Sequence, residues 1–562
     1  MLNRISTEHL AGDLSGGIRT AFLSLPVALA FGVISGAGPM AGYYSAVAVG
    51  LFAALFGGTP AQISGPTGPT ALVMAAVIFS YGFGPGEAFM VVMLAGLFQI
   101  LFGVLHLGRY VNLMPYPVIS GWMTGIGVVI ILMQLDPLLG YGSPRDPVSA
   151  ISSVAAHAGN VRPEAVLIGM ASFAVALFLP GPIARVVPSP LAALVLAMLL
   201  AGFVFPEVPT LPETTRILPS LYLPIPGADR IYDMLLTGLI IALLGGIDSL
   251  LGSMAADTAT NTLHNSDKEL VGQGIGNLAA GFLGGVPGAG AAQRTMHNVR
   301  NGGRTALSGI AHAGTLLALL PALAWGLPRL PVAGLSGILI AVAINTIDWR
   351  YLKRARTAPP TGLLLMFTVL LLTVFANLLV AVGVGVILAS LLFAKRMADL
   401  QLAAVRTLDN PAGEESLGPE EGEIMARLAG RVLLVQLSGP MSFVAANGLH
   451  GRLGRYQEYD ALVLDLSSVP YVDSSATLAL GNIIEKARGK NHTVELVGVN
   501  MQVARMFARL GVLDLIRDCD RHATRLDALR YLAGEFGVPV PETAPAEESG
   551  SASSSRSTIR SR

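Results

Sequence analysis

Charged residues and cysteine are scarce in this sequence. Only 13% of its 562 residues are charged and 52% are hydrophobic, whereas about 25% charged residues is usual for a soluble protein. A plain soluble enzyme is therefore not expected. The single cysteine, Cys519, excludes a disulfide framework and a cysteine-rich zinc site. The formal net charge of +0 gives no indication of nucleic-acid binding.

The charges that are present are distributed unevenly. More than half of them lie after residue 394, where they make up about a quarter of the chain, the usual density of a soluble domain. We therefore predict a long membrane domain followed by a smaller soluble one. Residues 1–13 are polar and lack the apolar core of a signal peptide, so we expect them to form a cytoplasmic N-terminal segment.

Apolar segments suited to crossing a membrane recur along the first 397 residues. A spanning helix needs about 20 such residues. The sequence predicts an α-helical polytopic domain of 14 segments, at residues 14–35, 41–57, 66–81, 87–107, 117–135, 163–180, 189–205, 231–253, 270–284, 289–300, 305–326, 331–347, 361–378 and 379–397.

The orientation of these segments follows from the Lys and Arg residues in short loops, which favour the cytoplasmic side. Basic residues follow even-numbered segments at 106–109, 300–304, 350–356 and 395–396. We therefore expect both termini and the soluble domain inside the cell, with the protein in the inner (plasma) membrane.

Two of the predicted segments are short and begin with glycine and proline. The third starts after Gly65-Pro66-Thr67-Gly68-Pro69 and the tenth after Pro287-Gly288-Ala289-Gly290. They occupy matching places in two halves of seven segments, and an odd number per half gives the halves opposite topology. Inverted repeats with a broken segment in each half indicate a transporter site near the membrane midplane. There, free backbone N–H groups can face an anion. The alternative is that these glycines are ordinary kinks.

Few ionisable residues lie within the apolar segments. Asp248 falls in the eighth and Arg294 in the tenth. Such residues face protein or a water-filled cavity, because burying a charge at the bilayer centre costs at least about 2.5–3.5 kcal/mol. Asp248 and Arg294 are thus candidates for a substrate and coupling site. The alternative is a structural ion pair that only joins two helices.

Several motifs together resemble the sulfate permease family of anion transporters. They are Leu25 to Gly32, Gly65 to Pro69, Met114 to Gly121, Asn265 to Asn277, and Gly302 to Thr305. The resemblance implies 14 segments in a 7+7 inverted repeat, divided into core and gate domains. It also implies a C-terminal STAS domain and, commonly, a homodimer. The partners it implies are membrane lipid and a small anion of the bicarbonate, sulfate or dicarboxylate class, with no nucleic acid.

The resemblance also implies site residues. For the anion they are Pro26, Phe31, Thr67, Gly68, Gly290, Ala291, Ala292, Gln293 and Arg294, and for ion coupling they are Asp248 and Ser249. No cofactor is expected apart from a coupling ion.

The identity of that ion stays open between Na⁺ and H⁺. The sequences of these motifs are most similar to those of the cyanobacterial sodium-dependent bicarbonate transporters within the family. In that branch, threonine hydroxyls that bind sodium occupy the positions of Gly252 and Ala292. This sequence lacks both hydroxyls, while Arg294 resembles the tenth-segment arginine of the wider family and can itself supply positive charge. If Arg294 pairs with Asp248 in the empty carrier, an arriving anion frees the carboxylate to bind a proton. Anion exchange is the third possibility.

The soluble region alternates strand and helix patterns, which predicts a small α/β sheet covered by helices. Strands are expected at 432–437, 461–466 and 494–497 and helices at 474–488 and 501–510. The loop Val472 to Ala476 resembles the hallmark loop of STAS domains, which makes Ser475 a candidate regulatory phosphorylation site. Helix capping by Asp473 or Ser474 is the alternative.

The predicted domain organisation has five parts. Residues 1–13 form the N-terminal segment, 14–397 the transport domain, 398–424 a linker, 425–538 the STAS domain and 539–562 a disordered tail. We predict a secondary active anion transporter that acts by cation-coupled symport. The alternatives are an anion exchanger and a membrane sensor or scaffold with STAS output. An enzyme is not expected, because the chain has no Walker motif and no clustered metal ligands.

Overall fold

The protein divides into two compact units, between Ala389 and Ser390. The computed structural model describes Asn3 and residues 7–540, except 185–186, 212–217, 220, 223–228, 377, 404, 409–416, 429, 444–445, 447, 450–452 and 454–458. The predicted disordered tail therefore lies outside the described residues from 541 onward, as does the part of the predicted linker at 409–416.

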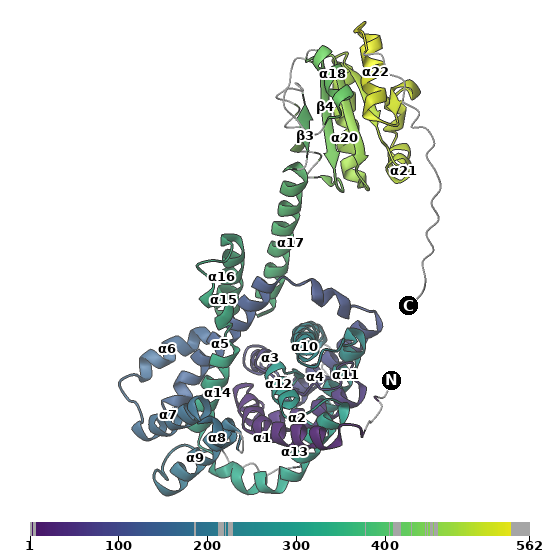
Figure 1. Cartoon of the computed structure of the whole chain (residues 1–562). Helices are drawn as coiled ribbons and strands as arrows, with labels where there is room; N and C mark the ends of the chain where they lie inside the picture. The colour runs from purple at the N-terminus through teal and green to yellow at the C-terminus, as the bar shows by residue number, and fades with distance from the viewer. Residues whose placement is uncertain are drawn as a thin grey trace. The chain divides into compact units, whose positions relative to one another are not determined.

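The first unit is almost entirely helical (Figure 1). Its helices are α1 (Leu10–Ile34), α2 (Pro39–Phe56), α3 (Gly68–Phe79), α4 (Pro85–Val104), α5 (Tyr116–Leu138), α6 (Pro147–His157), α7 (Pro163–Phe178), α8 (Gly181–Ala184), α9 (Ser189–Phe203), α10 (Ile231–Thr260), α11 (Ser266–Phe282), α12 (Ala292–Arg300), α13 (Ala306–Gly326), α14 (Val332–Thr346), α15 (Trp349–Lys353), α16 (Pro360–Phe375) and α17 (Leu378–Ala403).

Among the described residues, seven helices are long and apolar enough to cross a membrane, and five more are apolar but shorter. Each of the 14 predicted segments coincides with a helix, so the polytopic helical fold is confirmed. The ends differ by several residues in places. Helix α1 begins at Leu10, inside the predicted N-terminal segment, and α10 continues past residue 253 to Thr260. Each extension contains an aspartate, Asp13 or Asp257, which lowers its hydropathy and sets the predicted end short of the helix end.

The membrane helices form two groups (Figure 1). Helices α1 to α4 pack with α10 to α13, and α5, α7, α9, α14 and α16 pack with one another. The first group contains four segments from each half of the chain and corresponds to the predicted core domain. The second group corresponds to the predicted gate domain.

Glycines allow the helices of the core group to pack closely. A Cβ atom on Gly96 of α4 would lie 2.5 Å from the carbonyl oxygen of Gly274 in α11, and one on Gly274 would lie 2.5 Å from that of Gly96. Close approach of this kind drives helix association where the solvent is as apolar as the side chains.

The two broken segments meet inside the core group. Strand β1 (Ser64–Pro66) pairs antiparallel with β2 (Gly288–Gly290), with Ser64 opposite Gly290 and Pro66 opposite Gly288. Each strand is followed directly by a short helix, α3 or α12. This pairing joins the two halves of the chain at matching positions, which the sequence alone did not predict.

The second unit contains a five-stranded sheet in the order β3-β4-β5-β6-β7, in which only the β3–β4 pair is antiparallel. Its elements are β3 (Arg406–Leu408), α18 (Pro419–Arg427), β4 (Val432–Ser438), β5 (Ala461–Ser468), α20 (Ser474–Gly489), β6 (Thr493–Val497), α21 (Met501–Arg509), β7 (Arg521–His522) and α22 (Arg525–Glu535). Helices α20 and α21 bury one apolar cluster against the sheet, and α18 and α22 bury another.

This α/β architecture agrees with the prediction for the soluble region. The segment 398–424, expected to be a linker, contains the end of α17, strand β3 and the start of α18. Strand β3 is short and polar, so a hydropathy pattern does not reveal it, and its position depends on pairing with β4.

Candidate functional site

The start of α3 and the start of α12 flank the β1–β2 pair in the interior of the core group. Gly65 in β1 has φ +152°, a conformation that favours glycine. A Cβ atom on Gly65 would lie 2.9 Å from Nη1 of Arg294. The absence of a side chain at this position lets the guanidinium lie directly against the strand backbone.

Arg294 is 4% exposed and extends from the first turn of α12 toward the end of β1. Its Nη2 atom donates a hydrogen bond to the carbonyl oxygen of Pro66 at 2.8 Å. Its Nη1 atom is buried and has no hydrogen-bond partner in the described part of the chain. A cation in the first turn of a helix opposes the helix dipole. A buried arginine there, with an unused donor, creates a positive site that an anion can occupy.

Asp248 lies on α10 beside the same junction. The Thr67 hydroxyl and the charge of Arg294 both act on its carboxylate. The Oδ2 atom is buried and has no partner among the described residues. Within the described part of the chain, no ion pair joins Asp248 to Arg294. The Nη2 atom of Arg294 donates to the carbonyl oxygen of Pro66 instead. The predicted Asp–Arg pair is therefore absent from this structure, and one oxygen of the carboxylate is available for a proton or a cation.

Ser249, the other residue predicted for ion coupling, forms two hydrogen bonds within the protein. Its hydroxyl donates to the carbonyl oxygen of Gly245 at 2.6 Å and accepts from the amide of Gly290 at 2.9 Å. It therefore ties α10 to β2. A Cβ atom on Gly252 would lie 3.0 Å from the carbonyl oxygen of Gly290, so α10 packs closely on β2 here.

The remaining predicted anion-site residues lie around the same junction. Phe31 of α1 is 5% exposed, and a Cβ atom on Gly68 would meet Phe31 at 3.9 Å and Ile130 of α5 at 2.9 Å. Pro26 is buried within α1. Thr67 is 6% exposed and its backbone N–H donates to the Thr70 hydroxyl at 3.2 Å.

The predicted anion-site residues at the start of α12 differ from one another in exposure. Gly290 is buried, and Ala291 and Ala292 are half-buried. Gln293 is exposed and precedes Arg294 by one residue. Successive residues of a helix differ in direction by about 100°, so the geometry does not bring Gln293 to the buried side that Arg294 occupies.

Sequence reasoning missed three buried polar side chains on α11. Glu269, Gln273 and Asn277 are 1% exposed or less. Their spacing of four residues along an otherwise apolar and glycine-rich helix places them on one face. That spacing was the available signal, and it was read only as part of a family motif.

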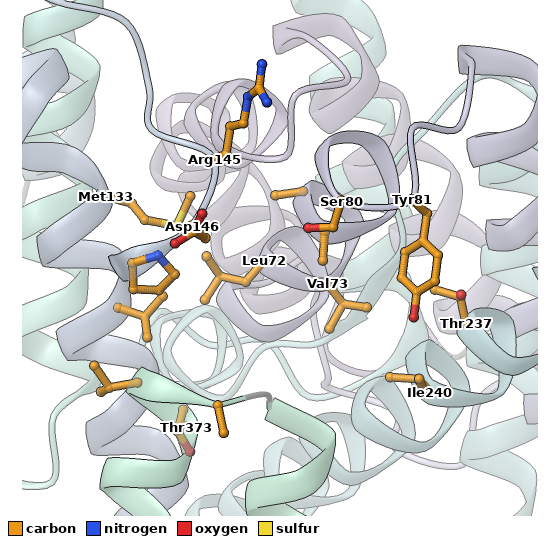
Figure 2. Close-up of a pocket in the computed structure, with 16 residues that line it drawn as sticks. Leu72, Val73, Ser80, Tyr81, Met133, Arg145, Asp146, Thr237, Ile240 and Thr373 are labelled. Atoms are coloured by element: carbon orange, nitrogen blue, oxygen red, sulfur yellow. The ribbon is translucent and has the colours of Figure 1, made fainter. Parts of the chain in front are cut away.

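A cavity of about 330 Å³ lies between α3, α5, α10 and α16 (Figure 2). Leu72 and Val73 of α3, Met133 of α5, Ile240 of α10 and Thr373 of α16 line it, with Arg145 and Asp146 from the segment before α6. Asp146 caps α6 by accepting from the amides of Val148 and Ser149. The cavity therefore lies between core and gate helices, beyond the start of α3.

No group of three or more His, Cys, Asp and Glu residues suited to a metal ion occurs among the residues that the structure describes. In the second unit, Asp473 caps α20 by accepting from the amide of Ala476 at 2.6 Å. Ser475 is exposed in the first turn of α20. The capping alternative thus accounts for Asp473, and phosphorylation of Ser475 stays a prediction.

Known proteins similar to this chain cover nearly its whole length. It is 43% identical to the bicarbonate transporter BicA of Picosynechococcus sp., over 98% of this chain and 99% of the relative. It is 42% identical to the bicarbonate transporter BicA of Synechocystis sp., over 97% and 98% respectively.

Two solved structures share the fold. The transmembrane domain of a cyanobacterial bicarbonate transporter BicA is 44% identical and matches with a TM-score of 0.65, over 68% of this chain and 99% of that one. The murine anion transporter Solute Carrier 26 family member A9, in its inward-facing state, matches with a TM-score of 0.77 at 17% identity, over 94% and 92% respectively.

The family profiles match both units of the chain. The sulfate permease family matches residues 10–369 and the STAS domain matches residues 423–526. These matches and the near full-length relatives agree with the pairing of β1 with β2. The chain is therefore a membrane protein of the sulfate permease family of anion transporters, with a C-terminal STAS domain, and it is not an enzyme.

Proposed function

We propose that this protein imports bicarbonate across the inner membrane by cation-coupled symport. The similarity to two proteins named as bicarbonate transporters, at 43% and 42% identity over nearly the whole chain, supports the choice of anion. The observation that carries the proposal of a site is the buried Nη1 atom of Arg294, which has no partner among the described residues.

The chemistry of the junction suits a small oxyanion. The anion accepts from Nη1 of Arg294, from the backbone N–H of Gly68 at the start of α3 and from the backbone N–H groups that begin α12, where the helix dipoles add positive potential. A guanidinium holds a carboxylate-like group by two parallel hydrogen bonds. Apolar contacts from Phe31 and Ile130 border Gly68 at the start of α3 and limit the access of water.

We infer that the coupling ion is a proton bound by Asp248. A hard cation such as sodium requires several oxygen ligands, and one of the two lone pairs of the Ser249 hydroxyl already accepts from the amide of Gly290. Neither Gly252 nor Ala292 carries a hydroxyl. A proton needs only the single free oxygen Oδ2. Arrival of the anion at Arg294 adds negative charge near this carboxylate and thereby favours its protonation.

The proposal includes the topology and the assembly. Basic loops such as residues 350–356, which lie between α14 and α16, favour the cytoplasmic side, so both termini and the STAS domain lie inside the cell. Following the family resemblance, we expect a homodimer embedded in lipid.

The test is uptake of [¹⁴C]bicarbonate into proteoliposomes at fixed external pH. We expect uptake with choline in place of sodium, and stimulation by an inward proton gradient. Strict sodium dependence without a response to the gradient contradicts the proton proposal but retains bicarbonate symport. Uptake that requires an anion on the opposite side indicates exchange. The profile match to a sulfate permease family makes [³⁵S]sulfate the second substrate to test, and uptake of sulfate alone contradicts the bicarbonate proposal.

A further inference from the structure

The face of α11 formed by Glu269, Gln273 and Asn277 contacts both strands, β1 and β2. On this face, Asn277 is fully buried and forms two hydrogen bonds with one residue of β2. Its side-chain N–H donates to the carbonyl oxygen of Gly288 at 3.0 Å, and its Oδ1 accepts from the amide of Gly288 at 2.7 Å. Asn277 therefore satisfies the backbone of β2 as a neighbouring strand would.

One turn before Asn277, the same face of α11 binds the other strand, β1. Gln273 donates to the Ser64 hydroxyl of β1 at 2.6 Å and to Oε1 of Glu269 at 2.8 Å. Glu269 accepts in turn from the amides of Gly58 and Thr59, each at 2.8 Å, in the segment that leads into β1. One helix thus binds both of the strands that come from opposite halves of the chain.

These contacts are needed because the β1–β2 pair is weak by itself. It contains only three residue pairs, and β2 has the sequence Gly-Ala-Gly. Short, glycine-rich strands specify their register poorly, since they offer few side chains to fix it. Any shift of β2 along β1 changes the position of α12, and therefore of Arg294, relative to Pro66.

We propose that Asn277 is a positioning residue for the anion site. It fixes the register of β2 against β1 and so holds the Arg294 guanidinium and the start of α3 at the separation that binds the anion. This inference rests on the proposed function, because it assigns Asn277 a role at the same site.

The test compares Asn277→Leu with Gln99→Leu in the full-length protein. Leucine nearly preserves the shape of asparagine but removes both hydrogen bonds to Gly288. Gln99 is equally buried and accepts from Nδ2 of Asn277 at 2.8 Å, and among the described residues it forms no hydrogen bond with either strand. Gln99→Leu therefore removes a neighbouring polar group and leaves the Asn277–Gly288 bonds. Three quantities are measured for each variant: the Kd for bicarbonate in detergent, the KM for [¹⁴C]bicarbonate uptake, and the Tm.

We expect Asn277→Leu to raise both Kd and KM roughly ten-fold, the effect of losing one to two buried hydrogen bonds, while Gln99→Leu leaves both near the wild-type values. A lower Tm with unchanged Kd and KM makes Asn277 merely structural and overturns the inference. If Asn277→Leu does not fold, Asn277→Ser, which keeps a single hydroxyl for Gly288, is expected to show a smaller rise in both constants, and wild-type constants for Asn277→Ser again overturn it. Failure of the wild-type protein to bind or take up bicarbonate instead contradicts the proposed function.

Discussion

The guanidinium of Arg294 hydrogen bonds to the carbonyl oxygen of Pro66 at 2.8 Å, although 228 residues separate them in the chain. This contact crosses from the first turn of α12 to the last residue of β1. It uses one of the two terminal nitrogens and leaves the other buried and unpartnered within the described residues. Arg294 can therefore hold the junction together and bind an anion at the same time.

The first prediction concerns that double role. Arg294→Ala is expected to abolish bicarbonate uptake, because it removes the positive charge from the junction. Arg294→Lys should retain a small part of the activity, since an ammonium keeps the charge but cannot serve Pro66 and an anion with the fixed fork of a guanidinium. Uptake into proteoliposomes measures the effect, with size-exclusion chromatography to check that each variant is folded. Wild-type uptake by a folded Arg294→Ala protein removes Arg294 from the site.

The second prediction concerns coupling through Asp248. Asp248→Asn cannot gain or lose a proton and has no charge for a cation. We expect bicarbonate to equilibrate across the membrane in this variant without responding to a proton or sodium gradient. Counterflow at equal bicarbonate concentrations on both sides measures exchange in the absence of coupling. Gradient-driven accumulation by Asp248→Asn assigns Asp248 a structural role only.

The third prediction concerns Gly65. Gly65→Ala adds a Cβ atom 2.9 Å from Nη1 of Arg294 at a φ of +152°, and a residue held in such a conformation costs roughly 1–3 kcal/mol. We expect uptake to fall about ten-fold or more. Gly314→Ala in α13 is the matched control, because a Cβ atom on Gly314 meets nothing within 4 Å. Equal uptake by the two variants shows that the close approach at Gly65 is not needed.

The fourth prediction uses the single cysteine of the chain. Cys519 is exposed, so Cys519→Ser gives a cysteine-free background in one step. In that background, Val73→Cys lines the cavity between core and gate helices (Figure 2), whereas the adjacent Met74 is 0% exposed and is not among the lining residues. With the N-terminus inside the cell, the third segment ends on the outer side, so we expect this cavity to form a vestibule open to the outer face. A membrane-impermeant methanethiosulfonate applied to that face should label Val73→Cys and not Met74→Cys. Equal labelling of both contradicts an outer vestibule at this cavity.

The fifth prediction concerns the pH dependence of the STAS domain. Glu495 of β6 is fully buried and contacts Nε2 of His522 at 2.7 Å. Burial raises the pKa of Glu495 to about 8, with the nearby carboxylates of Asp520 and Glu535 adding to the shift. Burial lowers the pKa of His522. The folded domain therefore favours a protonated Glu495 beside a neutral His522.

Because the folded-state pKa of Glu495 is raised, its contribution to stability is complete at acidic pH and is lost as the pH rises through about 8. His522 stays neutral throughout that window and does not oppose the effect. Between pH 7 and pH 9 we expect the Tm of a domain spanning residues 398–540 to fall by about 4 °C. Glu495→Gln, which stays neutral, should not show this fall. Circular dichroism measures both, and parallel curves contradict the prediction.

Local patterns were sufficient to predict the architecture. Hydropathy located every membrane helix, and the glycine and proline residues before α3 and α12 located both broken segments, because each signal lies within about 20 residues of chain. The same local information identified Arg294 and Asp248 as ionisable residues within apolar segments.

Contacts between distant segments could not be predicted in this way. Gln273 meets Ser64 across 209 residues, and nothing near either residue specifies the other. Ser249 was predicted for ion coupling from the family resemblance, and the sequence did not reveal that its hydroxyl also links α10 to β2. Gln293 was assigned to the anion site from the family resemblance, and the structure places it at an exposed position. Neighbours along a helix point in different directions, so adjacency in sequence did not predict adjacency in space.

The pairing of β1 with β2 also constrains how the protein is made. Ser64 to Pro66 leave the ribosome more than 200 residues before Gly288 to Gly290, which are their only paired strand among the described residues. Throughout that interval the N-terminal half carries a segment of extended backbone without its partner, and unsatisfied backbone groups are costly in hydrocarbon. The first half therefore cannot reach its final form when it enters the membrane. Insertion of the second half completes both, and the anion site comes into existence only at that late step of biosynthesis.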